Sequence, residues 1–356
     1  MANIADTVAA SDLSAIHTGG LIREDVMNKI WDISRIPLPF TDMVGTGSAK
    51  NEYKEWTTDE LAAPDPGNAV GDGTDATGDN SAFGSRVGNH HQISDKVVRV
   101  TYRADASDTI GRAKELSYQL MRRQQELRRD VEAISLLNQA SLADDNAGDV
   151  VGLCGGLPTW LESNNVNFGT TPGFDKAGTG TKVTSVGVVT ADGIALTEGA
   201  IRDLVQDIYN DGGNPTKLMA VPAVIRQISE YLFTSSARVA TLMSDQGKSG
   251  EKATALGSVN VFVTDFGTLT LVPNRLQQSY GASYATPSLA GVNSDVFILD
   301  PEYVSLCYMK GYRTDSLAKT GLAEKRQMSV DWSLIVNTEK AHGVIPSVEN
   351  AGTMTA

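Results

Sequence analysis

Two stretches decide the fold of this chain: NEYKEWT at residues 51–57 and QISDKVVRVTY at residues 92–102. In the second stretch apolar and polar side chains alternate, which is the pattern of a half-buried strand. The residues between the two, 62–91, contain six glycines and two prolines and too few apolar side chains to form a core. We therefore predict a long hairpin over residues 50–104 whose middle is supported by a neighbouring subunit.

The composition is typical of a globular protein that stays in the cytosol. At 356 residues with 41% hydrophobic content, the chain is long enough for about two domains. No apolar run approaches the ~20 residues of a membrane span, and the first residues lack a signal peptide. The net charge of −13 argues against sequence-specific DNA binding, which needs clustered Lys and Arg. Cys154 and Cys307 are expected to be buried, reduced thiols rather than a disulfide or a reactive site.

An arm and a long helix flank the hairpin. We expect residues 1–49 to form an arm that attaches through Trp31, Ile33 and Phe40, because prolines prevent a continuous helix there. The strongest helical pattern covers residues 108–142, with Ser107 or Asp108 as a cap and a length of roughly 50 Å at 1.5 Å per residue. Its apolar side chains fall on one face of the helix: Ala113, Leu116, Leu120, Leu127, Val131 and Ile134.

The second half of the chain predicts an α/β unit and then strands. Residues 144–195 are rich in Gly, Thr, Asn and Asp, which indicates an irregular insertion anchored by residues 157–161. A compact unit follows, with a helix from Thr197 to Gly212, a strand at 217–221 and a helix opened by Pro222. Extended segments are then predicted at 259–263, 268–272, 296–299, 303–309 and 328–337. We expect the C-terminal strands to form a sheet that packs on the long helix.

An ordered series of motifs resembles the major capsid proteins of tailed bacteriophages, in particular podovirus-like head proteins with the Hong Kong 97 fold. The resemblance runs from about residue 20 to about residue 345. The motifs that carry it are Asn51–Leu61, Arg86–Asn89 with Gln92–Ser94, Glu126–Glu132, Val263–Gly267, Val272–Arg275, Leu299–Tyr303, Leu317–Gly321 and Glu324–Gln327.

The resemblance implies an α+β fold of the Hong Kong 97-like class, with an N-terminal arm, an extended E-loop hairpin, a P-domain and an α/β A-domain. In such a fold the long helix is the spine of the P-domain, beside an antiparallel sheet. The implied divisions are 1–49 for the arm, 50–104 for the E-loop, 105–195 for the spine helix and insertion, 196–291 for the A-domain, 292–350 for C-terminal P-domain strands and 351–356 for a tail.

The function implied is that of a shell subunit. Identical copies would form hexamers and pentamers of an icosahedral capsid around double-stranded DNA, bound without sequence specificity. A portal protein and a separate scaffold or cement protein are the other expected partners. Some relatives carry a cleaved scaffolding segment of roughly a hundred residues, whereas the hairpin here begins near residue 50, which implies a separate scaffold or none. Such a protein assembles in the bacterial cytoplasm and resides in the virion. No motif identifies a Lys–Asn cross-link.

Two alternatives stay open at this stage. An encapsulin-like nanocompartment shell shares the fold and would differ by having cargo enzymes encoded nearby. A soluble enzyme with an ordered lid loop would be a monomer or a small oligomer with a pocket. Electron microscopy of the purified protein separates this enzyme from both shells.

Charge suggests how copies touch each other. Residues 50–80 hold eight acidic side chains against Lys50 and Lys54, so we predict that this arm of the hairpin docks on a basic surface of a neighbour. The outward face of the long helix, with Arg122 and Arg129, is the expected surface, although a solvated loop and a solvated helix face are open interpretations. The full set of candidate contact residues is Trp31, Phe40, Tyr53, Trp56, Asp59, Arg86, His90, His91, Arg122 and Arg129.

Motifs for catalysis and for metal or cofactor binding are weak, and none of these functions is expected. Residues 45–50 lack the spacing of a phosphate-binding loop and are interpreted as a turn. Residues 72–79 supply aspartates without the ligand order of a calcium loop. His90 and His91 would point to opposite faces of a strand, which is poor geometry for a shared metal. No Ser-His-Asp or Cys-His set is evident.

Overall fold

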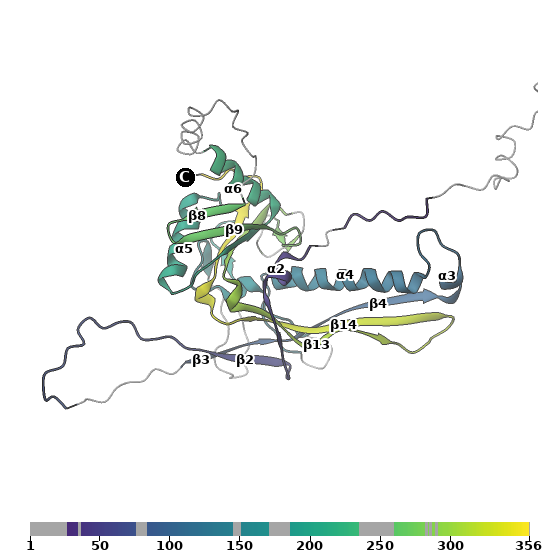
Figure 1. Ribbon diagram of the computed structural model, residues 1–356, viewed down its shortest axis with the longest axis horizontal. Helices are drawn as coiled ribbons and strands as arrows, with labels where there is room; N and C mark the ends of the chain where they lie inside the picture. The colour runs from purple at the N-terminus through teal and green to yellow at the C-terminus, as the bar shows by residue number, and fades with distance from the viewer. Residues whose placement is uncertain are drawn as a thin grey trace, which may run out of the picture.

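The computed structural model describes residues 27–34, 37–75, 84–144, 151–170, 186–234, 260–281, 284, 287–288 and 291–355 (Figure 1). Its helices and strands are α2 (Pro39–Met43), β1 (Gly45–Ser48), β2 (Tyr53–Thr58), β3 (Ser85–His90), β4 (Gln92–Thr101), α3 (Tyr102–Ala106), α4 (Glu115–Ser135), β5 (Phe168–Thr170), β6 (Val188–Val189), α5 (Glu198–Asn210), β7 (Lys217–Ala220), α6 (Pro222–Thr234), β8 (Val261–Thr264), β9 (Gly267–Pro273), β10 (Ser279–Tyr280), β11 (Pro287–Ser288), β12 (Asn293–Leu299), β13 (Val304–Ser316), β14 (Ala323–Val336) and β15 (Gly343–Glu349).

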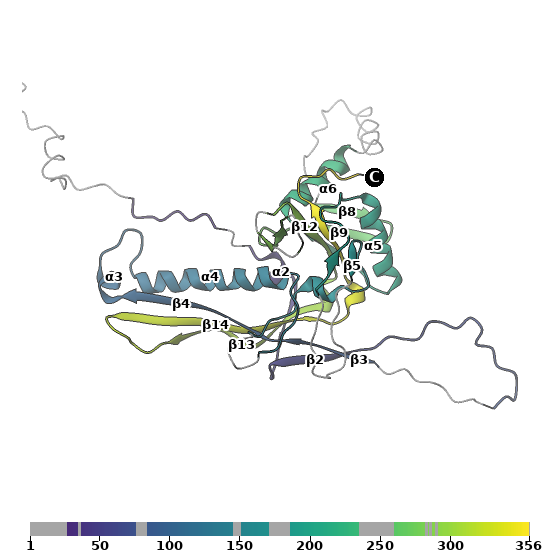
Figure 2. The ribbon, with the colours of Figure 1, turned by 180° about the vertical axis from the view of Figure 1, so that it is seen from behind.

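One layer of the molecule is a long sheet with α4 on one face. The sheet has the order β1-β13-β14-β4, and Figures 1 and 2 show α4 lying along it. Lys96 of β4 and Asp130 of α4 form an ion pair of 2.6 Å, so the even-numbered side chains of β4 face the helix. Buried apolar side chains of α4 and β14 fill the space between them, namely Leu127, Val131, Met328, Val330, Trp332 and Leu334. The expected sheet on the long helix is therefore confirmed.

The α/β unit is a second layered body. Its sheet has the order β11-β10-β12-β7-β9-β8, with β15 paired to β12. Thr197 caps α5, because its hydroxyl accepts a hydrogen bond of 3.0 Å from the Ala200 amide, and Pro222 opens α6. The apolar faces of these helices pack on one face of the sheet. The helix, strand and helix expected from Thr197 onward are confirmed.

The hairpin differs from its prediction. β2 pairs with β3, from Tyr53 opposite His90 to Thr58 opposite Ser85, whereas the expected return strand, β4, pairs with β14. The chain changes partner at His91, whose amide donates a hydrogen bond of 2.8 Å to the carbonyl of Glu52. A pattern of alternation identifies a strand but not the distant strand with which it pairs.

The long helix is shorter than predicted at both ends. It covers Glu115–Ser135, not 108–142, and α3 is a separate short helix. The turn between them places Gly111 at a φ of +76°, which a continuous α-helix does not allow. Ala113 consequently precedes the helix and is exposed, while the Leu120, Leu127, Val131 and Ile134 side chains lie in or against the core as expected.

Two further expectations were wrong. Residues 45–48 are the strand β1, which pairs in parallel with β13, instead of a turn. The division between 291 and 292 does not separate the two sheets, because β12 and β15 belong to the sheet of β7 and β9, whereas β13 and β14 belong to the sheet beside α4. The pairing of β1 with β13 and the pairing of β12 with β7 each join segments far apart in the chain, which local patterns do not reveal.

Asp295 is a buried carboxyl at the centre of β12. Its Oδ2 accepts hydrogen bonds from the hydroxyls of Tyr280 (3.1 Å) and Tyr284 (3.0 Å), and its Oδ1 accepts one from the Ser347 amide (3.0 Å). Burial raises its pKa to about 7, against the effect of these three donors. Asp295 therefore changes protonation in the folded protein near neutral pH.

We predict that Asp295 makes the folded protein less stable as the pH rises. The pKa of Asp295 in the folded protein lies above its value in the unfolded chain. Its contribution to the free energy of unfolding is therefore complete below about pH 4 and falls, by at most ~4 kcal/mol, as the pH rises through about 7. The free energy of unfolding of the wild type, measured from pH 4 to 8, should therefore fall relative to that of Asp295→Asn. A constant difference between the two proteins would contradict this prediction.

Candidate functional site

The N-terminal arm is fastened to α4 by one buried carboxylate. Glu132 accepts hydrogen bonds from the Phe40 amide (2.8 Å), the Thr41 amide (2.7 Å) and the Thr41 hydroxyl (2.6 Å). Asn274, which follows β9, donates a fourth hydrogen bond of 2.7 Å to the same carboxylate. Burial raises the pKa of Glu132, and the four donors oppose that rise. Phe40 is fully buried in the core beside α4, so it is not available for contact with a neighbour.

The base of the hairpin is held firmly by its own chain. Asn89 is buried and donates to the carbonyls of Leu334 (2.8 Å) and Gly155 (3.2 Å), while its own oxygen accepts from the Gly155 amide (2.9 Å). Trp56 packs on Trp160 with ring centroids 5.2 Å apart. These contacts orient β2 and β3, and therefore the loop that they carry.

Both histidines of the hairpin are buried, contrary to their prediction as contact residues. The His90 ring packs on Tyr53 at 4.5 Å, and the His91 Nδ1 lies 3.1 Å from the Asp331 carboxylate. Burial lowers the pKa of His91, although Asp331 acts in the opposite direction. Both side chains stabilise the point where the chain passes from β3 to β4, and neither reaches the surface.

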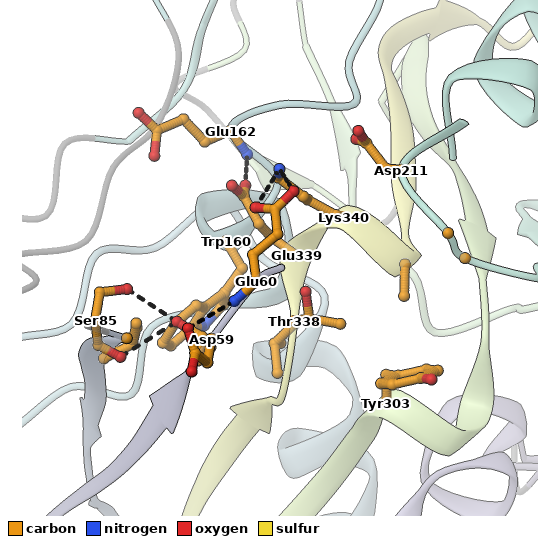
Figure 3. Close-up of a pocket in the computed structure, with 17 residues that line it drawn as sticks. Asp59, Glu60, Ser85, Trp160, Glu162, Asp211, Tyr303, Thr338, Glu339 and Lys340 are labelled. Carbon is orange, nitrogen blue, oxygen red and sulfur yellow. Dashed lines mark hydrogen bonds and ion pairs between the residues drawn. The ribbon is translucent and has the colours of Figure 1, made fainter. Parts of the chain in front are cut away.

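A cavity of about 530 Å³ lies between the hairpin base and the α/β unit (Figure 3). Within it the Glu60 carboxylate pairs with Lys340, with distances of 2.8 and 2.9 Å, and Glu339 accepts from the Glu162 amide at 2.8 Å. The first contact joins the hairpin to the turn before β15, and the second joins the segment after Trp160 to the same turn. Among the residues that the structure describes, no group of three or more His, Cys, Asp or Glu is arranged to hold a metal ion.

The segment that follows β2 is acidic and fully exposed. We call residues 59–75 the acidic segment; it contains Asp59, Glu60, Asp65, Asp72 and Asp75 and no Lys or Arg. Two large apolar side chains on it, Leu61 and Val70, are 95% and 77% exposed. From residue 61 to residue 75 the hydrogen bonds between described residues are all local, and Figure 1 shows this part of the loop projecting beyond the rest of the fold. The segment has little support from its own chain.

The sheet beside α4 has an uncovered face. Odd-numbered side chains of β4 point away from the helix, and their β14 partners in register point the same way. Ile93 is 67% exposed and Val97 49%. We call this surface the open sheet face; it consists of Ile93, Asp95, Val97, Arg99, Lys325 and Gln327, with Asp95 accepting a hydrogen bond from Gln327.

The opposite side of that layer carries an arginine face on α4, made of Arg122, Arg128 and Arg129. Arg122 and Arg128 are exposed and Arg129 is half-buried. The four carboxylates of α4 are engaged elsewhere: Glu115 with Arg112, Glu126 with Arg123, Asp130 with Lys96, and Glu132 with the arm.

The ten candidate contact residues thus separate by exposure. Trp31, Asp59, Arg86 and Arg122 are exposed, Tyr53, Trp56 and Arg129 are half-buried, and Phe40, His90 and His91 are buried. Arg86 pairs with Glu55 across the hairpin. Sequence reasoning missed Leu61, Val70, Ile93 and Val97; an apolar residue inside a polar loop or on the polar side of an alternating strand was the available signal.

Cys154 and Cys307 are buried free thiols, as expected, and burial raises the pKa of Cys154 to about 11. In the part of the chain that the structure describes, no helix is long and apolar enough to cross a membrane.

Solved structures with the same arrangement are capsid and encapsulin shells. The capsid protein of an empty GTA particle superposes with a TM-score of 0.58 at 13% identity, covering 96% of this chain and 100% of the other. The encapsulin of the holo-SrpI complex from Synechococcus elongatus PCC 7942 superposes with a TM-score of 0.54 at 12% identity, covering 94% and 95%. The fold is therefore that of the Hong Kong 97-like shell proteins, as expected.

The family is shown by sequence. Residues 5–349 match the family described as SU10 major capsid protein, and the chain belongs to that family. The major capsid protein of Escherichia phage Phieco32 is 38% identical over 102 residues, a match that spans 29% of this chain and 29% of that relative. Family membership confirms the expectation of a capsid shell protein that associates with itself.

We predict that Glu132→Gln loosens the arm and lowers the free energy of unfolding by about 2–4 kcal/mol. The amide would turn an NH₂ group toward backbone and side-chain donors, which leaves buried donors without an acceptor. Denaturant unfolding measures the loss, and hydrogen exchange of residues 39–43 measures the release of the arm.

Glu126→Gln is the matched control on the same helix, because Glu126 is partly exposed and pairs only with Arg123 in the described structure. Its loss should stay below about 1 kcal/mol. Equal effects of the two substitutions would show that Glu132 has no special role.

Proposed function

We propose that this chain forms the hexamers and pentamers of an icosahedral shell that encloses the double-stranded DNA genome of a tailed phage. Assembly would take place in the bacterial cytoplasm, with a portal protein and a separate scaffold or cement protein as further partners. The acidic segment is the observation that carries the proposal. It has five carboxylates and two exposed apolar side chains, and beyond the Glu60–Lys340 pair it makes little contact with the other described residues. Exposed apolar side chains on a projecting loop favour burial against another subunit.

We place the acidic segment of one copy on the open sheet face of the next. Arg99 and Lys325 on that face, against the single carboxylate of Asp95, complement its charge, and Ile93 and Val97 offer apolar surface to Leu61 and Val70. The arginine face of α4 has one exposed large apolar neighbour among the described residues, Met121, so it offers less apolar surface than the open sheet face. The open sheet face therefore replaces α4 as the proposed docking surface.

The proposed domains of the subunit follow from its two layers. We propose residues 1–49 as the arm, 50–104 as the E-loop with its following strand, 105–195 as the spine helix and insertion, and 196–291 as the core of the A-domain. Residues 292–350 are shared, since they supply strands to both sheets. The cavity contacts around Lys340 and the Asn89 hydrogen bonds would transmit the position of the A-domain to the hairpin.

Replacing residues 61–83 with two glycines should leave a folded subunit that forms no closed particles. β2 and β3 would remain joined by a five-residue loop, a common hairpin length, and the Glu60–Lys340 pair would be kept. Thermal unfolding should change by only a few degrees, while electron microscopy and size exclusion should show unassembled subunits. Normal particles from this variant would refute the proposed role of the loop.

Neutralising the acidic segment without shortening it distinguishes the effect of its charge on assembly from the effect of its length. Asp65→Asn with Asp72→Asn and Asp75→Asn should slow assembly at low ionic strength and make its rate less sensitive to salt, since screening lengths fall from ~30 Å at 0.01 M to ~3 Å at 1 M. Assembly of the triple variant with the salt dependence of the wild type would show that the carboxylates do not guide docking.

A further inference from the structure

The arginine face of α4 is a continuous cationic surface. At 100° per residue, Tyr118, Met121, Arg122, Gln125, Arg128 and Arg129 share an arc of about 120° that contains no exposed carboxylate. Glu132 falls on the same arc but is buried beneath α2. In a chain of net charge −13, a surface with three arginines and no ion pair to a carboxylate among the described residues favours binding of an anion.

Two of the three arginines lie against aromatic rings. The guanidinium of Arg128 lies 5.4 Å from the ring centroid of Tyr312, and that of Arg122 lies 5.9 Å from the ring centroid of Tyr118. Such contacts reduce the freedom that each side chain loses when it binds. Arg122 and Arg129 are seven residues apart, which is about 10 Å along the helix, or about three phosphate steps of one DNA strand at ~3.4 Å of axis each.

The acidic segment of another copy is an alternative anion for the arginine face. Each chain, however, has one such segment and two faces with the charge to attract it. The open sheet face offers two exposed apolar side chains, Ile93 and Val97, to the apolar side chains of the segment, whereas the arginine face offers only Met121 among the described residues. The two faces lie on opposite sides of the same layer, because Lys96 on the even side of β4 contacts α4 and Arg99 on the odd side points away. In a closed shell, opposite sides of a layer tend toward opposite sides of the wall.

We propose that the arginine face of α4 contacts the phosphate backbone of the duplex DNA enclosed by the shell. This inference rests on the proposed function of the chain as the shell around a DNA genome. The contact is weak, independent of sequence and sensitive to salt, because it releases counterions through three charges on an otherwise acidic protein. Weak contact also allows the DNA to move past the wall during packaging.

Two double variants of the full chain test the assignment. Arg122→Gln with Arg128→Gln neutralises the two exposed side chains of the arginine face, and Arg99→Gln with Lys325→Gln is the matched control on the open sheet face. Each protein is mixed, as unassembled subunits, with a fluorescent random-sequence duplex, and anisotropy is measured as salt is varied. Assembly of the same proteins is followed by electron microscopy.

The wild type and the Arg99/Lys325 control should bind the duplex with the same salt dependence. In the Arg122/Arg128 variant the slope of log K against log salt should be smaller in magnitude by about 1.8, at 0.9 per lost phosphate contact, while closed shells still form. Absence of DNA binding by the wild type, or an unchanged slope in this variant, would overturn the inference but not the proposed function. Loss of shells in this variant, with normal shells in the control, would show that α4 receives the acidic segment of another copy.

Discussion

The carboxylate of Glu132 is the interaction on which the arrangement of the subunit depends most. It lies in α4, yet its four hydrogen bonds come from the arm at Phe40 and Thr41 and from Asn274 at the end of β9. Removing any one donor leaves a buried charge with fewer partners, which is costly in a low-dielectric interior. Arm, helix and α/β unit are therefore held as one body, and the hairpin is carried at a defined angle to that body.

The two proposed contact surfaces lie toward opposite ends of the subunit, which favours repeated association. The acidic segment projects at one end of the molecule, and the open sheet face lies on the layer that extends to the other end (Figure 1). Contact between two different surfaces is heterologous, so each copy both offers a loop and receives one, and the contact closes into rings if the rotation allows. Most of the loop's hydrogen bonds are local, which leaves it free to adapt to slightly different neighbours, while the base stays fixed by Asn89.

Local signals predicted local structure well. α5, β7 and α6 were predicted close to their limits, because Thr197, Gly212 and Pro222 mark their boundaries chemically. The ends of α4 were missed, since the turn at Gly111 depends on contacts with Asn28 and Ile30 of the arm. The pairing of β4 with β14, the exposure of Leu61 and the burial of Glu132, His90 and His91 all depend on segments distant in the chain. No periodicity of the sequence carries that information.

The most direct test of the proposed docking is to determine which surface of one copy lies beside the acidic segment of another. Val70→Cys, Val97→Cys and Met121→Cys each introduce one accessible thiol, because Cys154 and Cys307 are buried. Mixed shells of the Val70 and Val97 variants, treated with a short bis-maleimide, should give cross-linked dimers on a denaturing gel, and mixed shells of the Val70 and Met121 variants should not. Dimers that form with the Met121 variant and not with the Val97 variant would contradict the proposed docking and would show that the loop docks on α4.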